Sequence, residues 1–213
     1  MSLYFLLTAT TFAADPDKKH HHQGVAQRFS NPTKTELSSE EKDLLKKGEA
    51  VRKQVREGNG GRGIAIMDVS ASSEDIWSVI TDFKKYPEWI DQMDSSSIYA
   101  TNPKSDHTEI LVDFTLSAMM ISVQYYIDHS YYPDKGYLTW TLDYSKLSDL
   151  DDSTGYWLVY PSPDDPNKSR VEYSVDLRVS GWIPGFVEDM LANQGLVDAT
   201  KWMKRESEKR AAQ

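Results

Sequence analysis

The sequence predicts one α+β domain with N-terminal extensions, and three observations carry this prediction. A strand that ends near Val69 is followed directly by two short helical segments, up to Asp94. About six segments between residues 98 and 179 then alternate apolar and polar residues, which is typical of antiparallel strands with one buried face. Finally, an apolar stripe at helical spacing follows Pro184 and continues to about Lys209.

The first residues have the composition of a secretory signal. Residues 3–12 are mostly apolar, and the small residues Ala13 and Ala14 follow them. The apolar run is too short to span a bilayer, and no Lys or Arg precedes it. Residues 1–14 are therefore a candidate signal peptide, with a misassigned start as the alternative. A true signal implies a secreted, periplasmic or lumenal protein, and its absence implies a cytoplasmic one.

The next two segments are predicted to be a linker and a short helix. Residues 15–37 are polar and contain two prolines, which favours a disordered linker. Its cluster His20–His22 has no Cys or acidic ligand at a fixed spacing beside it, so no metal site is expected. A helix is predicted over 38–48 because Ser38 and Glu41 form a capping box. The stretch that follows is open between a helix and a strand.

The segment from 64 to 94 predicts the end of a strand and two short helices. Ser72 or Ser73 is expected to cap the first helix, whose apolar face comes from residues 76–80. Asp82 is expected to cap the second helix. The Tyr86-Pro87 step is expected to interrupt it, because proline disfavours the helical conformation in the preceding residue.

A train of strands is predicted next, with turn-like breaks at 133–136, 148–153 and 162–169. The strands are expected at 98–100, 109–116, 119–129, 137–144, 154–160 and 171–179. The acidic run Asp149–Asp152 lacks the spaced ligands and the glycine of a calcium loop, so a solvated turn is the better interpretation.

Charge and cysteine content exclude several classes of function. The formal net charge of −9 disfavours binding to nucleic acid and to anionic lipid headgroups by charge. The chain has no cysteine, which removes disulfides, thiol nucleophiles and cysteine metal sites. No cofactor is expected, because no glycine-rich phosphate loop, Ser-His-Asp order or metal-ligand spacing occurs.

Two sets of residues resemble the START-like (SRPBCC) superfamily, the polyketide cyclase/dehydrase group, and most closely its coenzyme-Q-binding type. The first set is Val69, Ala71, Ile76-Trp77, Ile80-Thr81-Asp82-Phe83 and Tyr86-Pro87-Glu88-Trp89, with Ser72 in place of the family's proline. The second set is Gly155-Tyr156-Trp157-Leu158, Arg170-Val171-Glu172-Tyr173, Ile183-Pro184-Gly185-Phe186-Val187 and Gly195-Leu196. The resemblance covers roughly Glu49 to Lys204.

The resemblance implies a helix-grip fold over residues 49–210. A curved antiparallel sheet of about six to seven strands is then wrapped around a long C-terminal helix, with two short helices after the first strand. It also favours a strand rather than a helix just after residue 49. A single helix over a strongly curved sheet leaves room for a tunnel lined by aromatic residues.

Eleven residues are candidates for lining such a cavity, although each also fits an ordinary core. They are Trp77, Phe83, Trp89, Phe114, Tyr125, Trp140, Tyr144, Tyr173, Trp182, Phe186 and Met190. The most numerous hydrogen-bond donors among them are tyrosine hydroxyls and tryptophan N–H groups.

The leading hypothesis is non-catalytic binding or transport of a hydrophobic small molecule, a lipid or isoprenoid quinone. One alternative is a cyclase or dehydratase. His129 is then the candidate acid or base, because it shares the strand face of Tyr125. Another alternative is a protein-interaction module. No nucleic-acid partner and no stable membrane insertion of the mature chain are expected, and the oligomeric state is left open.

Overall fold

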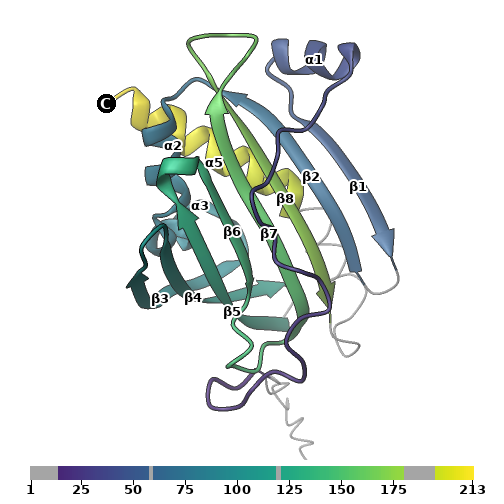
Figure 1. Cartoon of the computed structure of the whole chain (residues 1–213), viewed down its shortest axis with the longest axis vertical. Helices are drawn as coiled ribbons and strands as arrows, with labels where there is room; N and C mark the ends of the chain where they lie inside the picture. The colour runs from purple at the N-terminus through teal and green to yellow at the C-terminus, as the bar shows by residue number, and fades with distance from the viewer. Residues whose placement is uncertain (1–13, 58–59, 119–120, 180–194) are drawn as a thin grey trace, which may run out of the picture.

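A computed structural model describes residues 14–57, 60–118, 121–179 and 195–213, and its centre is an eight-stranded antiparallel sheet (Figure 1). The strand order is β1-β2-β8-β7-β6-β5-β4-β3. Sheet bounds are β1 Val51–Glu57, β2 Gly60–Val69, β3 Met93–Pro103, β4 Thr108–Ala118, β5 Ile121–Tyr132, β6 Tyr137–Leu142, β7 Leu150–Pro161 and β8 Ser169–Val179. The helices are α1 Ser39–Lys46, α2 Ser73–Ile80, η1 Phe83–Lys85, α3 Tyr86–Trp89, η2 Pro133–Lys135 and α5 Gly195–Ala211.

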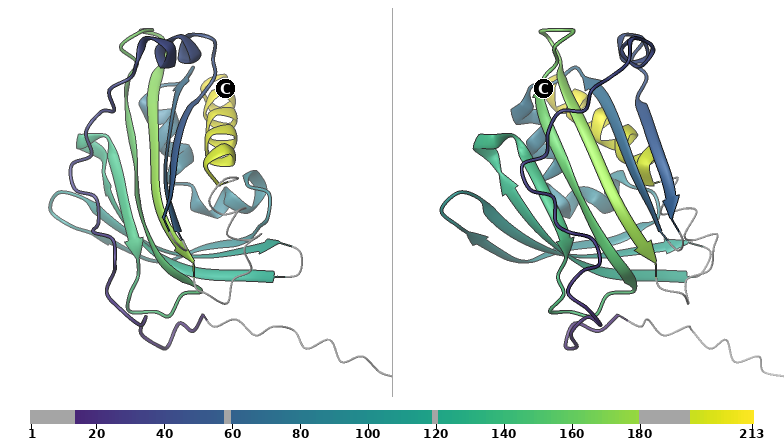
Figure 2. Two further views of the ribbon diagram at one scale, coloured as in Figure 1. Left: turned by 90° about the vertical axis from the view of Figure 1, so that its right-hand side faces the viewer. Right: turned by 45° about the vertical axis from the view of Figure 1, so that its right-hand side comes forward.

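The sheet is strongly curved, and its concave face holds the helices α2, α3 and α5. Figure 2 shows β3, β4 and β5 turned steeply away from the direction of β1, β2, β7 and β8. This arrangement confirms the predicted α+β helix-grip architecture, with eight strands where about six to seven were expected. The strand predicted after residue 49 is β1, which pairs with β2 from Val51 to Glu57.

The C-terminal half of α5 is fixed to the rest of the fold by hydrogen bonds to backbone atoms. The ammonium of Lys204 donates to the carbonyl of Asp68 at 2.8 Å, and Arg210 donates to the carbonyl of Ser78 at 2.9 Å. The helix approaches β2 closely at Gly63, where an added Cβ would lie 1.9 Å from Leu196. Glycine is therefore required at this point of the sheet.

Several predicted boundaries were wrong. Strand β3 begins at Met93, well before the expected residue 98. The prediction missed this start because the serines that precede residue 98 have low strand propensity. Asp82 makes no capping hydrogen bond to η1; its carboxylate instead pairs with Arg210 at 3.3 Å. Tyr86 is helical although a proline follows it, and the proline stands in the first turn of α3.

Two other predictions fall partly outside the described residues. The candidate signal peptide covers residues 1–14, of which only residue 14 is described. The helix expected from Pro184 is described from Gly195 onward as α5, and its earlier part is outside the described residues. No helix among the described residues is long and apolar enough to cross a bilayer.

Residues 14–37 lie along the outer face of the sheet, opposite α5, and we refer to them as the N-terminal strap (Figure 2). Asp15 forms an antiparallel bridge with Leu147. The His20 side chain is buried, with Nε2 2.8 Å from the carbonyl oxygen of Asp151. The strap has defined partners along its length, which differs from the disordered linker expected from its composition.

Carboxylates buried on the outer face explain why the strap is bound there. Asp152 accepts hydrogen bonds from the backbone N–H groups of Val25 and Ala26, at 2.7 and 2.9 Å. Glu172 is fully buried and accepts from the hydroxyl of Thr35 at 2.6 Å. A buried carboxylate without such donors costs several kcal/mol, so strap and sheet depend on each other.

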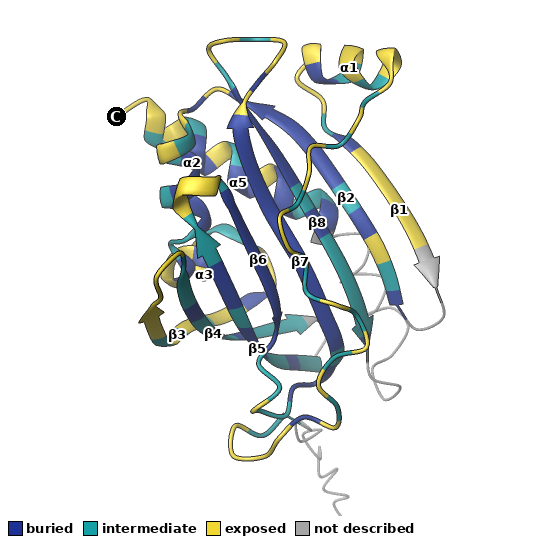
Figure 3. Ribbon diagram, viewed as in Figure 1, coloured by how far each residue is buried: buried dark blue, intermediate teal, exposed yellow. Residues whose placement is uncertain are grey.

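The predicted turn at 148–153 was wrong, and so was the expectation of one wet face for β6 and β7. Residues 150–161 form β7, and Asp149 and Asp152 are buried rather than solvated. Strands β6 and β7 are buried on both faces (Figure 3), because the strap covers one side and the helices cover the other. The acidic run was misread because a short acidic segment is typical of an exposed turn.

A buried ion pair joins the ends of β2 and β8. The guanidinium of Arg170 donates to both carboxylate oxygens of Asp68, at 2.8 and 3.0 Å. The two side chains are only 3% and 5% exposed. Asp164 adds a second carboxylate at 2.7 Å from the same guanidinium.

Asp68→Ala is expected to lower the free energy of unfolding by about 3 kcal/mol, because it removes the main partner of a buried guanidinium. Urea denaturation measures this loss. The control is Glu88→Ala, which breaks the exposed Lys85–Glu88 pair and should cost less than about 0.5 kcal/mol. Equal losses in the two variants would contradict a structural role for the Asp68–Arg170 pair.

Arg28→Ala tests the contact of the strap with the sheet. Arg28 pairs with Asp128 at 2.8 Å and donates to the hydroxyls of Ser130 and Thr141. Its removal should cost about 1–2 kcal/mol in urea unfolding, since the pair is partly exposed. Gln27→Ala, at the exposed neighbouring residue, is the control. If both variants unfold at the same urea concentration, the strap contact is not stabilising.

Candidate functional site

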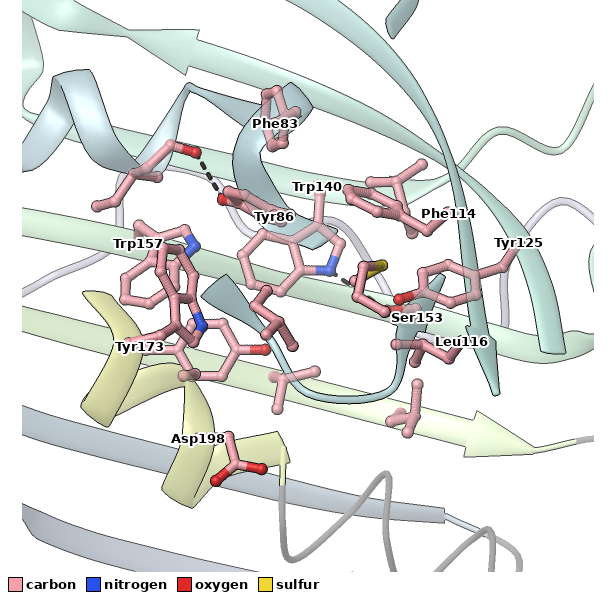
Figure 4. Close-up of a pocket in the computed structure, with 18 of the residues that line it drawn as sticks. Phe83, Tyr86, Phe114, Leu116, Tyr125, Trp140, Ser153, Trp157, Tyr173 and Asp198 are labelled. Atoms are coloured by element: carbon pink, nitrogen blue, oxygen red, sulfur yellow. Dashed lines mark hydrogen bonds between the residues drawn. The ribbon is translucent and has the colours of Figure 1, made fainter. Parts of the chain in front are cut away.

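A cavity of about 210 Å³ lies between the concave face of the sheet and the helices (Figure 4). Its walls come from strands β4 to β8, from η1 and α3, and from the first described turns of α5. Most of the lining is apolar, and it includes Leu116, Ile127, Leu138, Val175, Leu177 and Ala199 together with eight Phe, Tyr and Trp side chains. The cavity is thus suited to an apolar guest.

Strand alternation places these side chains on one face. Phe114 and Leu116 of β4 are two residues apart, as are Trp140 and Leu138 of β6. On β7, Gly155 leaves the space that the Trp140 indole occupies, because an added Cβ would lie 2.2 Å from that ring. The glycine in this segment therefore has a packing reason, which is close approach of an aromatic ring.

Two aromatic pairs form opposing parts of the wall. The rings of Phe114 and Tyr125 are stacked with centroids 5.4 Å apart, and those of Trp140 and Tyr173 are stacked at 5.7 Å. Trp157 packs against Tyr173 at 4.4 Å. Such contacts hold the rings in fixed positions and leave flat apolar surfaces toward the cavity.

The hydroxyls of Tyr125 and Tyr173 point inward from opposite walls (Figure 4). Neither hydroxyl has a hydrogen-bond partner among the described residues, although both residues line the cavity. Burial raises the pKa of each phenol, and the Tyr173 hydroxyl adds to the rise at Tyr125. Both phenols are therefore protonated at neutral pH and available as donors.

Two other polar groups in the wall have partners within the protein. The Tyr86 hydroxyl donates to the carbonyl of Ile80 at 2.6 Å. The indole N–H of Trp140 donates to the hydroxyl of Ser153 at 3.3 Å. Their hydrogen bonds fix the wall, so Tyr125 and Tyr173 are the better candidates for contact with a guest.

His129 of β5 lies in the same wall, buried against the ring of Phe83 at 4.6 Å. Its Nδ1 lies 3.1 Å from the carbonyl oxygen of Ile110, which can only accept, so Nδ1 carries the proton. Burial lowers the pKa of His129 to about 3. The imidazole is therefore neutral at physiological pH, with Nε2 unprotonated.

We call the part of the lining that is exposed or half-buried, in the α3–β3 connection and at Asp198 of α5, the mouth of the cavity. Asp91 and Gln92 line it and are exposed to solvent. Gln92 has a positive φ of 65°, and its carbonyl accepts a hydrogen bond from the N–H of Ser117 at 2.8 Å. Asp198 lines the same region from α5 (Figure 4).

The cavity brings together five of the eleven residues predicted to line it, namely Phe83, Phe114, Tyr125, Trp140 and Tyr173. Trp182, Phe186 and Met190 lie outside the described residues. The other three predicted residues do not line it.

Each of these three has another contact. Trp77 faces a separate, wide surface hollow beside α2 and packs on Tyr131 at 4.9 Å. Trp89 stacks on Trp202 at 5.9 Å, behind the cavity wall. Tyr144 follows the end of β6, and its hydroxyl donates to Asp152 at 2.6 Å, beside the strap.

Most of the lining was not selected from the sequence, and four of its residues show why. Trp157 and Trp202 were visible as an aromatic in a predicted strand and as part of the C-terminal apolar stripe. Tyr86 stood in the family-like segment before Pro87. Asp198 had no signal in the sequence, because an acidic residue on a helix is usually solvated.

Comparison with known proteins gives a family and a fold. The sequence profile described as "Polyketide cyclase / dehydrase and lipid transport" matches residues 69–200. A search of curated proteins finds no match.

Of the described residues, none form a cluster of three or more His, Cys, Asp or Glu side chains placed to hold a metal ion.

Three solved structures with the same fold are covered over nine tenths or more of their own length. A START superfamily protein from Mycobacterium smegmatis is 20% identical with a TM-score of 0.53, covering 75% of this chain and 97% of its own. A STAR-related lipid transfer protein from Xanthomonas axonopodis has 15% identity, a TM-score of 0.58 and coverages of 74% and 92%. The Zhui aromatase/cyclase from Streptomyces sp. R1128 has 13% identity and a TM-score of 0.55, and the match covers 75% of this chain and 96% of its own.

These identities are too low to transfer an activity, and the likeness to these structures shows the fold alone. The profile covers more than half of the chain, from the end of β2 into α5. The chain therefore belongs to the polyketide cyclase/dehydrase and lipid transport family of START-like proteins.

Proposed function

We propose that this chain binds and transports a hydrophobic small molecule, a lipid or an isoprenoid quinone, without changing it chemically. The observation that carries the proposal is the apolar cavity between sheet and α5, into which two unpartnered phenol hydroxyls point. A guest with a carbonyl or ether oxygen can accept a hydrogen bond from Tyr125 or Tyr173 while its rings or chain contact the aromatic wall.

The size of the cavity narrows the mode of binding. At about 210 Å³ it is smaller than the roughly 300–1,000 Å³ that is usual for drug-sized ligands. It suits one ring system or the end of an acyl chain. Burying one aromatic ring contributes roughly 4–6 kcal/mol, which alone corresponds to weak binding. A long apolar tail would therefore have to contact the mouth as well.

A cyclase or dehydratase is the second candidate, because His129 is buried in the cavity wall. Two observations favour binding over catalysis. A pKa of about 3 makes the imidazole a weak base at neutral pH. Its Nδ1–H donates to a backbone carbonyl rather than to a carboxylate that would stabilise a protonated ring.

The protein-interaction hypothesis has less support. The large apolar side chains exposed among the described residues are Val25, Val55 and Tyr99, which lie on three separate segments. Scattered apolar residues are normal on a monomer surface and do not form a docking patch. The hollow concave face is better explained by a small guest.

Native mass spectrometry of the full chain with a panel of lipids and quinones tests the binding proposal. A stoichiometric apolar ligand is expected, and Leu116→Trp should weaken its binding at least about tenfold by filling the cavity. Val55→Trp, which adds the same bulk to the exposed edge strand, is the control. Binding that is unaffected by Leu116→Trp would place the ligand elsewhere.

The same incubation separates transport from catalysis. The ligand recovered by extraction should have an unchanged mass after prolonged incubation. A product that forms with the wild-type chain and not with His129→Gln would instead support the cyclase or dehydratase.

The buried neutral state of His129 predicts a pH dependence of stability. In the unfolded chain His129 is protonated below about pH 6.5, whereas in the native protein it stays neutral until about pH 3. The free energy of unfolding therefore falls as the pH falls through this window. The contribution of His129 between pH 7 and pH 5 is about 2 kcal/mol. Urea unfolding at both pH values gives the loss in free energy of unfolding for wild type and for His129→Gln. The loss in wild type minus the loss in His129→Gln is the contribution of His129. A parallel loss in both proteins would show that His129 is protonated in the native state.

A further inference from the structure

The charged side chains that line the cavity are of one sign. Asp91 and Asp198 are both part of the lining, and no Lys or Arg is found among the described lining residues. A guest that enters past the mouth therefore meets carboxylates and no cation.

The basic residues of α5 are directed elsewhere. Lys204 pairs with Glu208 at 2.6 Å, and Arg205 pairs with Glu206 at 2.6 Å. Arg210 pairs with Asp82 at 3.3 Å. Lys201 is exposed and does not line the cavity.

The interior offers hydrogen bonds but no positive charge. The polar groups available to a guest include the two phenols and the unprotonated Nε2 of His129. Transfer of a carboxylate from water into such an apolar space costs several kcal/mol unless it is paired with a cation. An uncharged carbonyl or ester has no comparable penalty and can accept from the phenols.

We propose that the cavity selects uncharged ligands and excludes anionic amphiphiles such as fatty acids, and that Asp198 sets this preference at the mouth. The inference rests on the proposed function and specifies its ligand class. It distinguishes ketones, esters, alcohols and quinones from carboxylates and phosphates of the same apolar shape. Asp198 acts by like-charge repulsion, which is felt by an anion and not by its neutral counterpart.

The experiment compares 2-acetylnaphthalene with 2-naphthoate, which have the same ring and nearly the same shape but differ in charge at pH 7. Isothermal titration of the full chain should give a Kd for the ketone at least about tenfold lower than that for the carboxylate. In Asp198→Asn the carboxylate should bind about fivefold more tightly while the ketone is unchanged. Asp134→Asn, the same charge change on η2 and outside the lining, should leave both affinities as in wild type.

Carboxylate binding equal to or tighter than ketone binding would overturn the inference while leaving hydrophobic binding intact. Discrimination that persists unchanged in Asp198→Asn, or that is relieved equally by Asp134→Asn, would remove Asp198 from the account. If neither naphthalene compound nor any neutral lipid or quinone of the panel binds, the proposed function itself fails, and the charge preference fails with it.

Discussion

The position of α5 is the constraint on which the rest of the structure depends. Its C-terminal half is held against β2 and α2 by Lys204 and Arg210, both of which donate to backbone carbonyls. Its N-terminal described half, with Asp198, Ala199 and Trp202, covers the cavity. One end of the helix thus closes the concave face, while the other end roofs a hollow that the curvature of the sheet leaves open.

The two faces of the sheet solve opposite problems. The inner face is apolar and incompletely filled, so it has hydrophobic surface to offer a guest. The outer face contains Asp152 and Glu172, which need donors, and the strap supplies those donors from its backbone and from Thr35. Strands β6 and β7 are consequently buried on both sides, as in a sheet covered by two layers.

Period-2 alternation was sufficient to predict the strand faces of Phe114, Tyr125, Trp140 and Tyr173, because residues of one parity share one face. It failed for Tyr144, since β6 ends at Leu142 and parity has no meaning beyond a strand end. It also could not reveal Asp198, whose importance depends on where α5 crosses the sheet. The strap was missed because its partners, such as Asp152 and Glu172, are more than a hundred residues away in sequence, and composition does not report such contacts.

The pairing of β2 with β8 has a consequence for how the chain folds. Residues 60–69 are joined to residues 169–178, so two neighbouring strands of the sheet pair residues that are 100 or more positions apart in sequence. Contacts of such long range slow folding, because the chain between them must be ordered before the ladder forms. During synthesis the edge of β2 that pairs with β8 stays unpaired until β8 has left the ribosome. Folding of the sheet is therefore expected to be completed only after β8 has been translated.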